Sequence, residues 1–303
     1  MVTGRGARIS ALLLILAAAA AAVLAWAVPS SRPVEARLVI VGPAVVSTSL
    51  VEQADPAVFD AWAGTSASAA LDAVRRGRAD AAVVIDLTAD TDTLYLSDAS
   101  GSTGRRALTA AVGEVSGSLG RGVDVERVPI PHDRRTPYVV VLAALVLGFL
   151  AAIVATWLRG TFEPTFRAGT GRFVVFCGVG AVAGLACAGL GWTAVPLVTA
   201  LVVAAALTTT ALEALLDLGG IAASGILFLL VAGPLGRFTP TLLVPQPWHA
   251  VTPWLPHGAG LALADDIVLF GGAGAARDWA VVAVWVALSV LTLSVARNRR
   301  RSG

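Results

Sequence analysis

The sequence predicts an α-helical polytopic membrane protein: six transmembrane helices with an extracytoplasmic α/β domain between the first and second spans, and a re-entrant helix between the fifth and sixth. Of the 303 residues, 56% are hydrophobic and only 14% are charged, a composition typical of membrane proteins. Six segments are apolar over the length of about 20 residues that a bilayer requires. A long stretch of mixed composition separates the first of them from the second.

The predicted spans run 9–28, 137–158, 173–192, 193–216, 219–236 and 278–296. The first is expected to remain as an uncleaved anchor within residues 1–28, because its apolar run exceeds the roughly 7–15 residues of a signal peptide. Ala25-Trp26-Ala27 resembles a cleavage site, so cleavage is the alternative. The fifth is irregular because several glycines and Pro234 interrupt it. Residues 137–303 would form a five-helix membrane domain.

Arginine placement predicts the orientation. All 22 basic residues are arginine, which is typical of a GC-rich bacterial genome. Nine of them lie before the first span, between the second and third, and after the last: Arg5, Arg8, Arg159, Arg167, Arg172, Arg297 and Arg299–Arg301. Six spans with both termini inside place these groups on the cytoplasmic side, as the positive-inside rule requires. We expect a multi-pass protein of the bacterial plasma membrane.

Residues 29–136 then form one extracytoplasmic domain. Alternating or continuous apolar runs predict strands, and apolar residues at helical spacing predict helices. Strands are expected at 36–42, 80–87, 92–98 and 123–130, and helices at 66–79 and 103–119. The order β-α-β-β-α-β predicts a small α/β sandwich.

The segment 237–277 is expected to be a broken, partly re-entrant hairpin. Its prolines rule out a continuous span, and Trp248 and Trp254 favour the water–lipid boundary. Within 255–272 a short helix is predicted over 258–270 at the outer face, with Gly271-Gly272 ending it. A seventh span would place two aspartates in hydrocarbon and the C-terminal arginines outside.

Two quoted stretches resemble a known family. "ILFLLVAGPLGR" (226–237) and "LLVPQPWHAVTPWLPHGAGLALADDIVLFGG" (242–272) are similar to the last third of bacterial type-2 ABC transporter permeases and the related phage-infection-protein-like group. The matching motif residues are Leu255, Pro256, Gly258, Ala259, Phe270, Gly271 and Gly272. The chain departs from the pattern at Asp265, where the family has Arg, and at Leu269, where it has Tyr. A role of that Arg is therefore not carried over.

The resemblance implies a permease-like exporter subunit that dimerises, as a homo- or heterodimer, and is driven by a separate P-loop ATPase. It also implies an ATPase-docking loop at 159–172, with Phe162, Glu163 and Phe166 as candidates; a plain positively charged loop is the alternative. The alternative function is a membrane-anchored scaffold or receptor whose ectodomain binds an envelope partner. The substrate is not indicated.

Four carboxylates are candidate coupling or path residues, since acidic groups near hydrocarbon are costly. Glu213 and Asp217, spaced i, i+4, share one helix face; the readings are an interfacial position, a coupling or proton-path role, or pairing with Arg159 or Arg172. Asp265 and Asp266 are either a solvated interfacial edge or a polar gate.

Several chemistries are not expected. Without lysine the chain can hold neither a Walker A loop nor a Schiff base, and it has no G-x-S-x-G nucleophile motif. His132, His249 and His257 do not have the spacing of a metal site. We therefore expect no enzymatic activity, catalytic residue, cofactor or metal, and no nucleic-acid partner.

Overall fold

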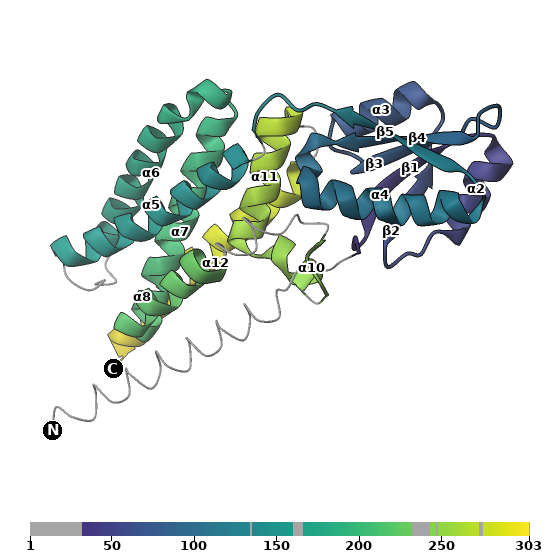
Figure 1. Cartoon of the computed structure of the whole chain (residues 1–303). Coiled ribbons are helices and arrows are strands. Elements are labelled where there is room, and N and C mark those ends of the chain that lie inside the picture. The colour runs from purple at the N-terminus through teal and green to yellow at the C-terminus, as the bar shows by residue number, and fades with distance from the viewer. Residues whose placement is uncertain are drawn as a thin grey trace.

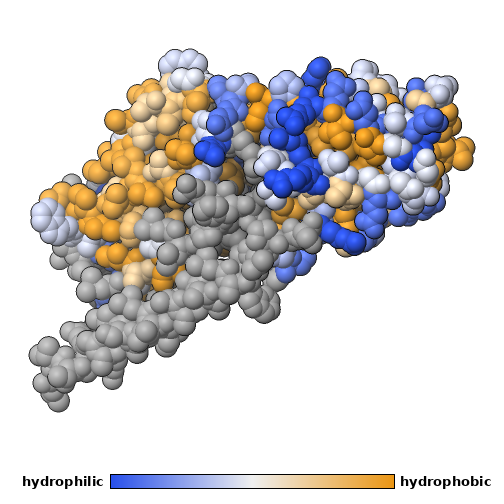
Figure 2. Space-filling model, in the orientation of Figure 1, coloured by the Kyte–Doolittle hydropathy of each residue, from blue (hydrophilic) through white to orange (hydrophobic). Residues whose placement is uncertain are grey.

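The fold comes from a computed structural model, which describes residues 32–133, 135–159, 166–231, 243–246, 248–272 and 275–302. An α/β domain lies at one end of a group of long helices (Figure 1). Apolar surface dominates the visible face of the helices, whereas the α/β domain shows a mixed, largely hydrophilic surface (Figure 2). The predicted first span, 9–28, lies outside the described residues.

The α/β domain contains one helix and one strand more than predicted. Its elements are β1 (Ala36–Val41), α2 (Ala44–Gln53), β2 (Phe59–Ala63), α3 (Ala67–Arg75), β3 (Ala81–Val84), β4 (Thr91–Ser97), the short helix η1 (Asp98–Ser100), α4 (Gly101–Ser118) and β5 (Gly122–Val128). The predicted strands and helices are all present with shifted ends; the additions are α2 and β2.

The five strands form one mixed sheet in the order β2-β1-β3-β4-β5. Strand β1 is parallel to both neighbours, with Ala36 opposite Phe59 on β2 and Leu38 opposite Ala81 on β3. The β3–β4 pair is an antiparallel hairpin, and β4 is parallel to β5. The parallel pairs need crossovers, and helices α2, α3 and α4 supply them.

Helices cover both faces of the sheet, which is why β1 and β3 read as continuous apolar runs. On one face Leu38, Ile40 and Leu94 pack with residues of α2 and α4. On the other face Val39 and Val41 pack with residues of α3. The alternation follows from the two-residue period of a strand.

The helical part continues the chain. Its elements are α5 (Arg135–Arg159), α6 (Phe166–Ala186), η2 (Ala188–Leu190), α7 (Ala194–Leu216), α8 (Leu218–Gly225), the π-helix η3 (Ile226–Val231), α10 (Trp248–Val251), η5 (Thr252–Trp254), α11 (Pro256–Phe270) and α12 (Ala276–Ser302). Helix α7 is central and contacts α5, α6, α8, α11 and α12.

Four helices of the described residues are long and apolar enough to cross a membrane: 135–158, 169–186, 194–216 and 276–296. They correspond to the predicted second, third, fourth and sixth spans. The third differs in its ends, since α6 stops at Ala186 instead of reaching 192; Gly189 lies in the short 3₁₀ helix η2, and Gly191 follows it with φ 117°. Only the first part of the predicted fifth span is described, as α8 and η3.

Two apolar clusters fix the helix directions. The cluster nearer the α/β domain takes Val141 of α5, Leu197 of α7 and Val281 of α12, and Ala99 and Ile130 of the α/β domain pack against it. The second cluster contains residues that come later in the sequence of each of these three helices. Helices α5, α7 and α12 therefore run in the same direction, away from the α/β domain. Helix α6 runs opposite, because its later residues join the first cluster.

The helix predicted within 255–272 is present as α11. Pro256 occupies its first turn, where a missing N–H is tolerated. Gly271 ends it with a left-handed φ of 75°, and the Gly272 N–H donates to the Asp266 carbonyl. The helix contacts α5, α7 and α12, so most of its surface is covered by protein.

Candidate functional site

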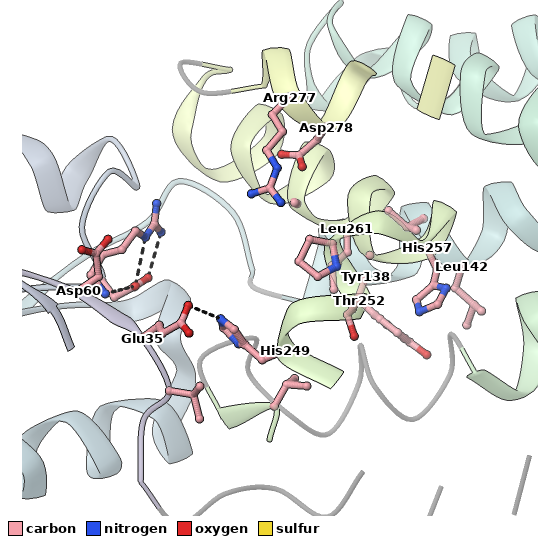
Figure 3. A pocket seen from close by; sticks show the side chains of 18 of the residues that line it. Glu35, Asp60, Tyr138, Leu142, His249, Thr252, His257, Leu261, Arg277 and Asp278 are labelled. Atoms are coloured by element: carbon pink, nitrogen blue, oxygen red, sulfur yellow. Dashed lines mark hydrogen bonds and ion pairs between the residues drawn. The ribbon is translucent and has the colours of Figure 1, made fainter. Parts of the chain in front are cut away.

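A cavity of about 610 Å³ lies where the α/β domain meets the helices (Figure 3). One wall comes from β1, β2 and the turn before β3. The other comes from α5, α10, η5, α11 and the start of α12. Pockets of this size between two structural units are common ligand sites. This junction cavity is the candidate functional site.

The α/β wall of the junction cavity is charged. The Arg37 side chain donates to both carboxylate oxygens of Asp80, at 3.3 and 3.1 Å, and its backbone N–H donates to the same group at 2.9 Å. Partial burial opposes the charge on Arg37, yet Asp80, Asp60 and Asp266 raise the pKa of its guanidinium above the ordinary value. Asp266, on α11, is thus within electrostatic reach of β1.

Polar contacts join the two walls. His249 on α10 lies with its Nε2 3.7 Å from Glu35 Oε2 (Figure 3), and the Gln246 side chain donates to Glu35 at 3.4 Å. On the helical wall the Arg277 guanidinium stacks 5.1 Å from the Trp254 ring centre, a cation–π geometry. The contacts of His249 and Gln246 with Glu35 join the helical side of the cavity to the α/β domain.

The deeper part of the helical wall carries unsatisfied polar groups. Neither imidazole nitrogen of His257 has a hydrogen-bond partner, nor does the Thr252 hydroxyl, among the residues that the structure describes. His257 is only 5% exposed, and burial lowers its pKa to about 4. The imidazole is therefore neutral near pH 7, with one donor and one acceptor to offer.

A close contact between Gly77 and α11 fixes the docking of the α/β domain. Gly77 follows α3 with φ 66°, and a Cβ built there would lie 2.5 Å from Cδ2 of Phe270. Only glycine combines this backbone with so near an aromatic ring. The last turn of α11 thus packs directly on the α/β domain.

A second polar group lies at the opposite end of the helices. Arg172 of α6 and Glu213 of α7 are 4% and 3% exposed, with Nη1 3.8 Å from Oε2. The Thr156 hydroxyl of α5 donates to the same oxygen at 2.7 Å. Of the readings open for Glu213, pairing with Arg172 is the one found. Three apolar helices are joined by this buried group.

The other predicted carboxylates lie apart. Asp217 does not share the helix face of Glu213, because α7 ends at Leu216 and Asp217 turns with φ 52° into an exposed position. Asp265 and Asp266 are half-buried on α11. Only Asp266 is placed near the junction cavity, through its effect on Arg37.

Much of the predicted docking loop, 159–172, lies outside the described residues. Phe162 and Glu163 lie outside the described residues, and Phe166 is the first residue of α6. The ends of α5 and α7 and the start of α6 lie at the end of the helices remote from the α/β domain.

The residues that carry the family resemblance shape α11. Leu255 precedes the helix and Pro256 starts it; Ala259 is fully buried in its core-facing side. At Gly258 a Cβ would collide with the Thr252 carbonyl, so the glycine allows η5 to approach α11. Phe270 contacts Gly77, and two positive-φ residues, Gly271 and Gly272, end the helix.

Sequence reasoning did not find the junction cavity. Its charged residues from β1 to β3 and its helical residues beyond 243 are far apart in the chain, and no spacing pattern joins them. One signal was present: His257 is a lone imidazole in an apolar helix, directly after the proline that starts it. Arg172 was one of the two partners considered for Glu213, and it directly precedes the predicted third span.

No group of three or more His, Cys, Asp or Glu among the described residues could hold a metal ion. No protein-family model, curated protein or solved structure matches the chain. The resemblance to type-2 ABC permeases stays a prediction from the quoted residues.

Proposed function

We propose that the chain is the membrane subunit of an ABC-type exporter in a bacterial plasma membrane, powered by a separate P-loop ATPase. The observation that carries the proposal is the junction cavity. Its floor is made by α11 and by α5, which is apolar and long enough to cross a bilayer, and its roof by a domain with a polar surface. A ligand in this cavity would be in contact with both environments at once.

The opposite end of the helices supports the same function. The three arginine-rich segments 159–172, 297–301 and, from the sequence, 5–8 belong to that end in a six-span topology with both termini inside. The buried Thr156–Arg172–Glu213 group ties α5, α6 and α7 together there. A force applied by an ATPase at 159–165 would reach these helices as a unit.

The test is purification of the tagged chain from its host in mild detergent, with identification of co-eluting proteins. The proposal expects one P-loop ATPase in stoichiometric amount. Phe162→Ala with Glu163→Ala should remove it, whereas Arg106→Ala, an exposed residue on α4, should not. Recovery of an envelope protein held through residues 32–128, with no P-loop ATPase, would overturn the proposal in favour of a scaffold or receptor.

A further inference from the structure

The junction cavity presents three chemically different surfaces. Apolar side chains of α5 and α11 form its floor: Val141, Leu142, Leu145, Leu261 and Ala262. His257 and Thr252 add buried polar atoms that lack partners within the described residues. The third surface is charged and belongs mostly to the α/β domain. A single ligand that suits all three must itself be amphiphilic.

The charged surface has a negative balance. Four carboxylates line the cavity, those of Glu35, Asp60, Asp80 and Asp278, against the guanidinium groups of Arg37 and Arg277. Both guanidinium groups are engaged, Arg37 with Asp80 and Arg277 with the Trp254 ring. Two negative charges remain in excess when the histidines are neutral. This wall attracts a cation and repels an anion.

The polar atoms next to the floor point to a ligand as well. A buried donor or acceptor without a partner keeps its desolvation penalty. His257 and Thr252 both line the cavity, and Figure 3 shows them with Tyr138 and Leu142 on the helical side. A head group that can donate and accept hydrogen bonds would satisfy the imidazole and the hydroxyl.

We propose that the junction cavity binds a cationic amphiphile, with its amine-bearing head toward Glu35 and Asp60 and its hydrocarbon chain between α5 and α11. The inference rests on the proposed function in treating this cavity as the substrate site. The carboxylates hold the ammonium head, and a hydroxyl or amide group of the ligand nearer the floor can exchange hydrogen bonds with His257 and Thr252. The chain replaces water on the apolar floor, and its burial favours binding.

The experiment uses the full-length chain in lipid nanodiscs and three photoreactive probes with the same diazirine-bearing dodecyl chain. Their heads are an amine, an alcohol and a carboxylate. After irradiation, mass spectrometry locates the adducts. The proposal expects labelling on α5 and α11, with the amine labelling about tenfold more efficiently than the carboxylate at equal concentration, a ratio equivalent to roughly 1.4 kcal/mol.

Variants separate the cavity from the lipid-facing surface. Leu261→Trp should fill the floor and remove the adducts, whereas Leu291→Trp, 60% exposed on α12, should leave them. Glu35→Gln with Asp60→Asn should erase the preference for the amine, whereas Asp124→Asn, exposed on β5, should keep it. His257→Phe keeps the ring and should weaken labelling by the amine and the alcohol.

Equal labelling by the three heads, or adducts that Leu261→Trp does not change, would overturn the proposal. The result is independent of any ATPase. Head-selective labelling with no co-eluting ATPase would leave the binding site standing and refute the exporter function. An ATPase complex without head-selective labelling would support the exporter function and refute the binding site.

Discussion

Arg172 and Glu213 form a buried ion pair between two of the described apolar helices. Removing one partner strands a buried charge, which costs about 3–5 kcal/mol. Arg172→Met or Glu213→Gln should therefore lower the thermal unfolding midpoint of the detergent-solubilised chain. The double variant Arg172→Met with Glu213→Met should recover part of the loss. Single variants as stable as the exposed control Arg106→Met would show that the pair is not formed.

His257 gives the fold a pH dependence. Its pKa is about 4 in the fold against 6.5 in the unfolded chain, so the unfolded chain binds the proton more tightly. The contribution of His257 to the free energy of unfolding is fully present above pH 6.5. It is lost as the pH drops toward 4, by on the order of 3 kcal/mol. Unfolding midpoints measured across this window should fall less steeply in His257→Phe. An unchanged slope would contradict the burial of a neutral imidazole.

At the scale of elements, the contact between Gly77 and α11 decides how the two parts of the molecule join. Gly77→Ala should loosen it, both through φ 66° and through contact with Phe270. Gly120→Ala is the matched control, because Gly120 has φ 69° and nothing within 4 Å of an added Cβ. Hydrogen exchange of the α11 amides should rise in Gly77→Ala alone. Adding Phe270→Ala to Gly77→Ala should partly restore the protection of these amides. Equal hydrogen exchange in Gly77→Ala and Gly120→Ala would show that Gly77 does not contact α11.

The sequence predicted α11 well and part of the α/β domain poorly, for physical reasons. Pro256 and Gly271 are local signals at the two ends of a helix, so α11 could be located. Helix α2 buries only Ser47, and β2 is a short edge strand, so neither shows a clear apolar period. The junction cavity could not be predicted, because it forms only when Gly77 and Phe270 bring distant segments together.

At the scale of the whole molecule, we expect the two ends of the helices to face opposite sides of the membrane. The α/β domain and the arginine-rich helix ends lie at opposite ends of the helices, so they should face opposite sides of the membrane. In a background lacking Cys177 and Cys187, Ser102→Cys should react with an impermeant thiol reagent in intact cells and Ser302→Cys should not. The reverse pattern would refute the orientation.

The central claim is that this chain forms a transport path whose energy comes from another subunit. The most direct measurement is vanadate-sensitive ATP hydrolysis by the purified chain and by the chain with its co-eluting partner. Because the sequence contains no lysine for a P-loop, the account predicts no turnover by the chain alone and clear turnover by the complex. Hydrolysis by the verified pure chain, or a chain that yields no hydrolysing complex, would contradict it.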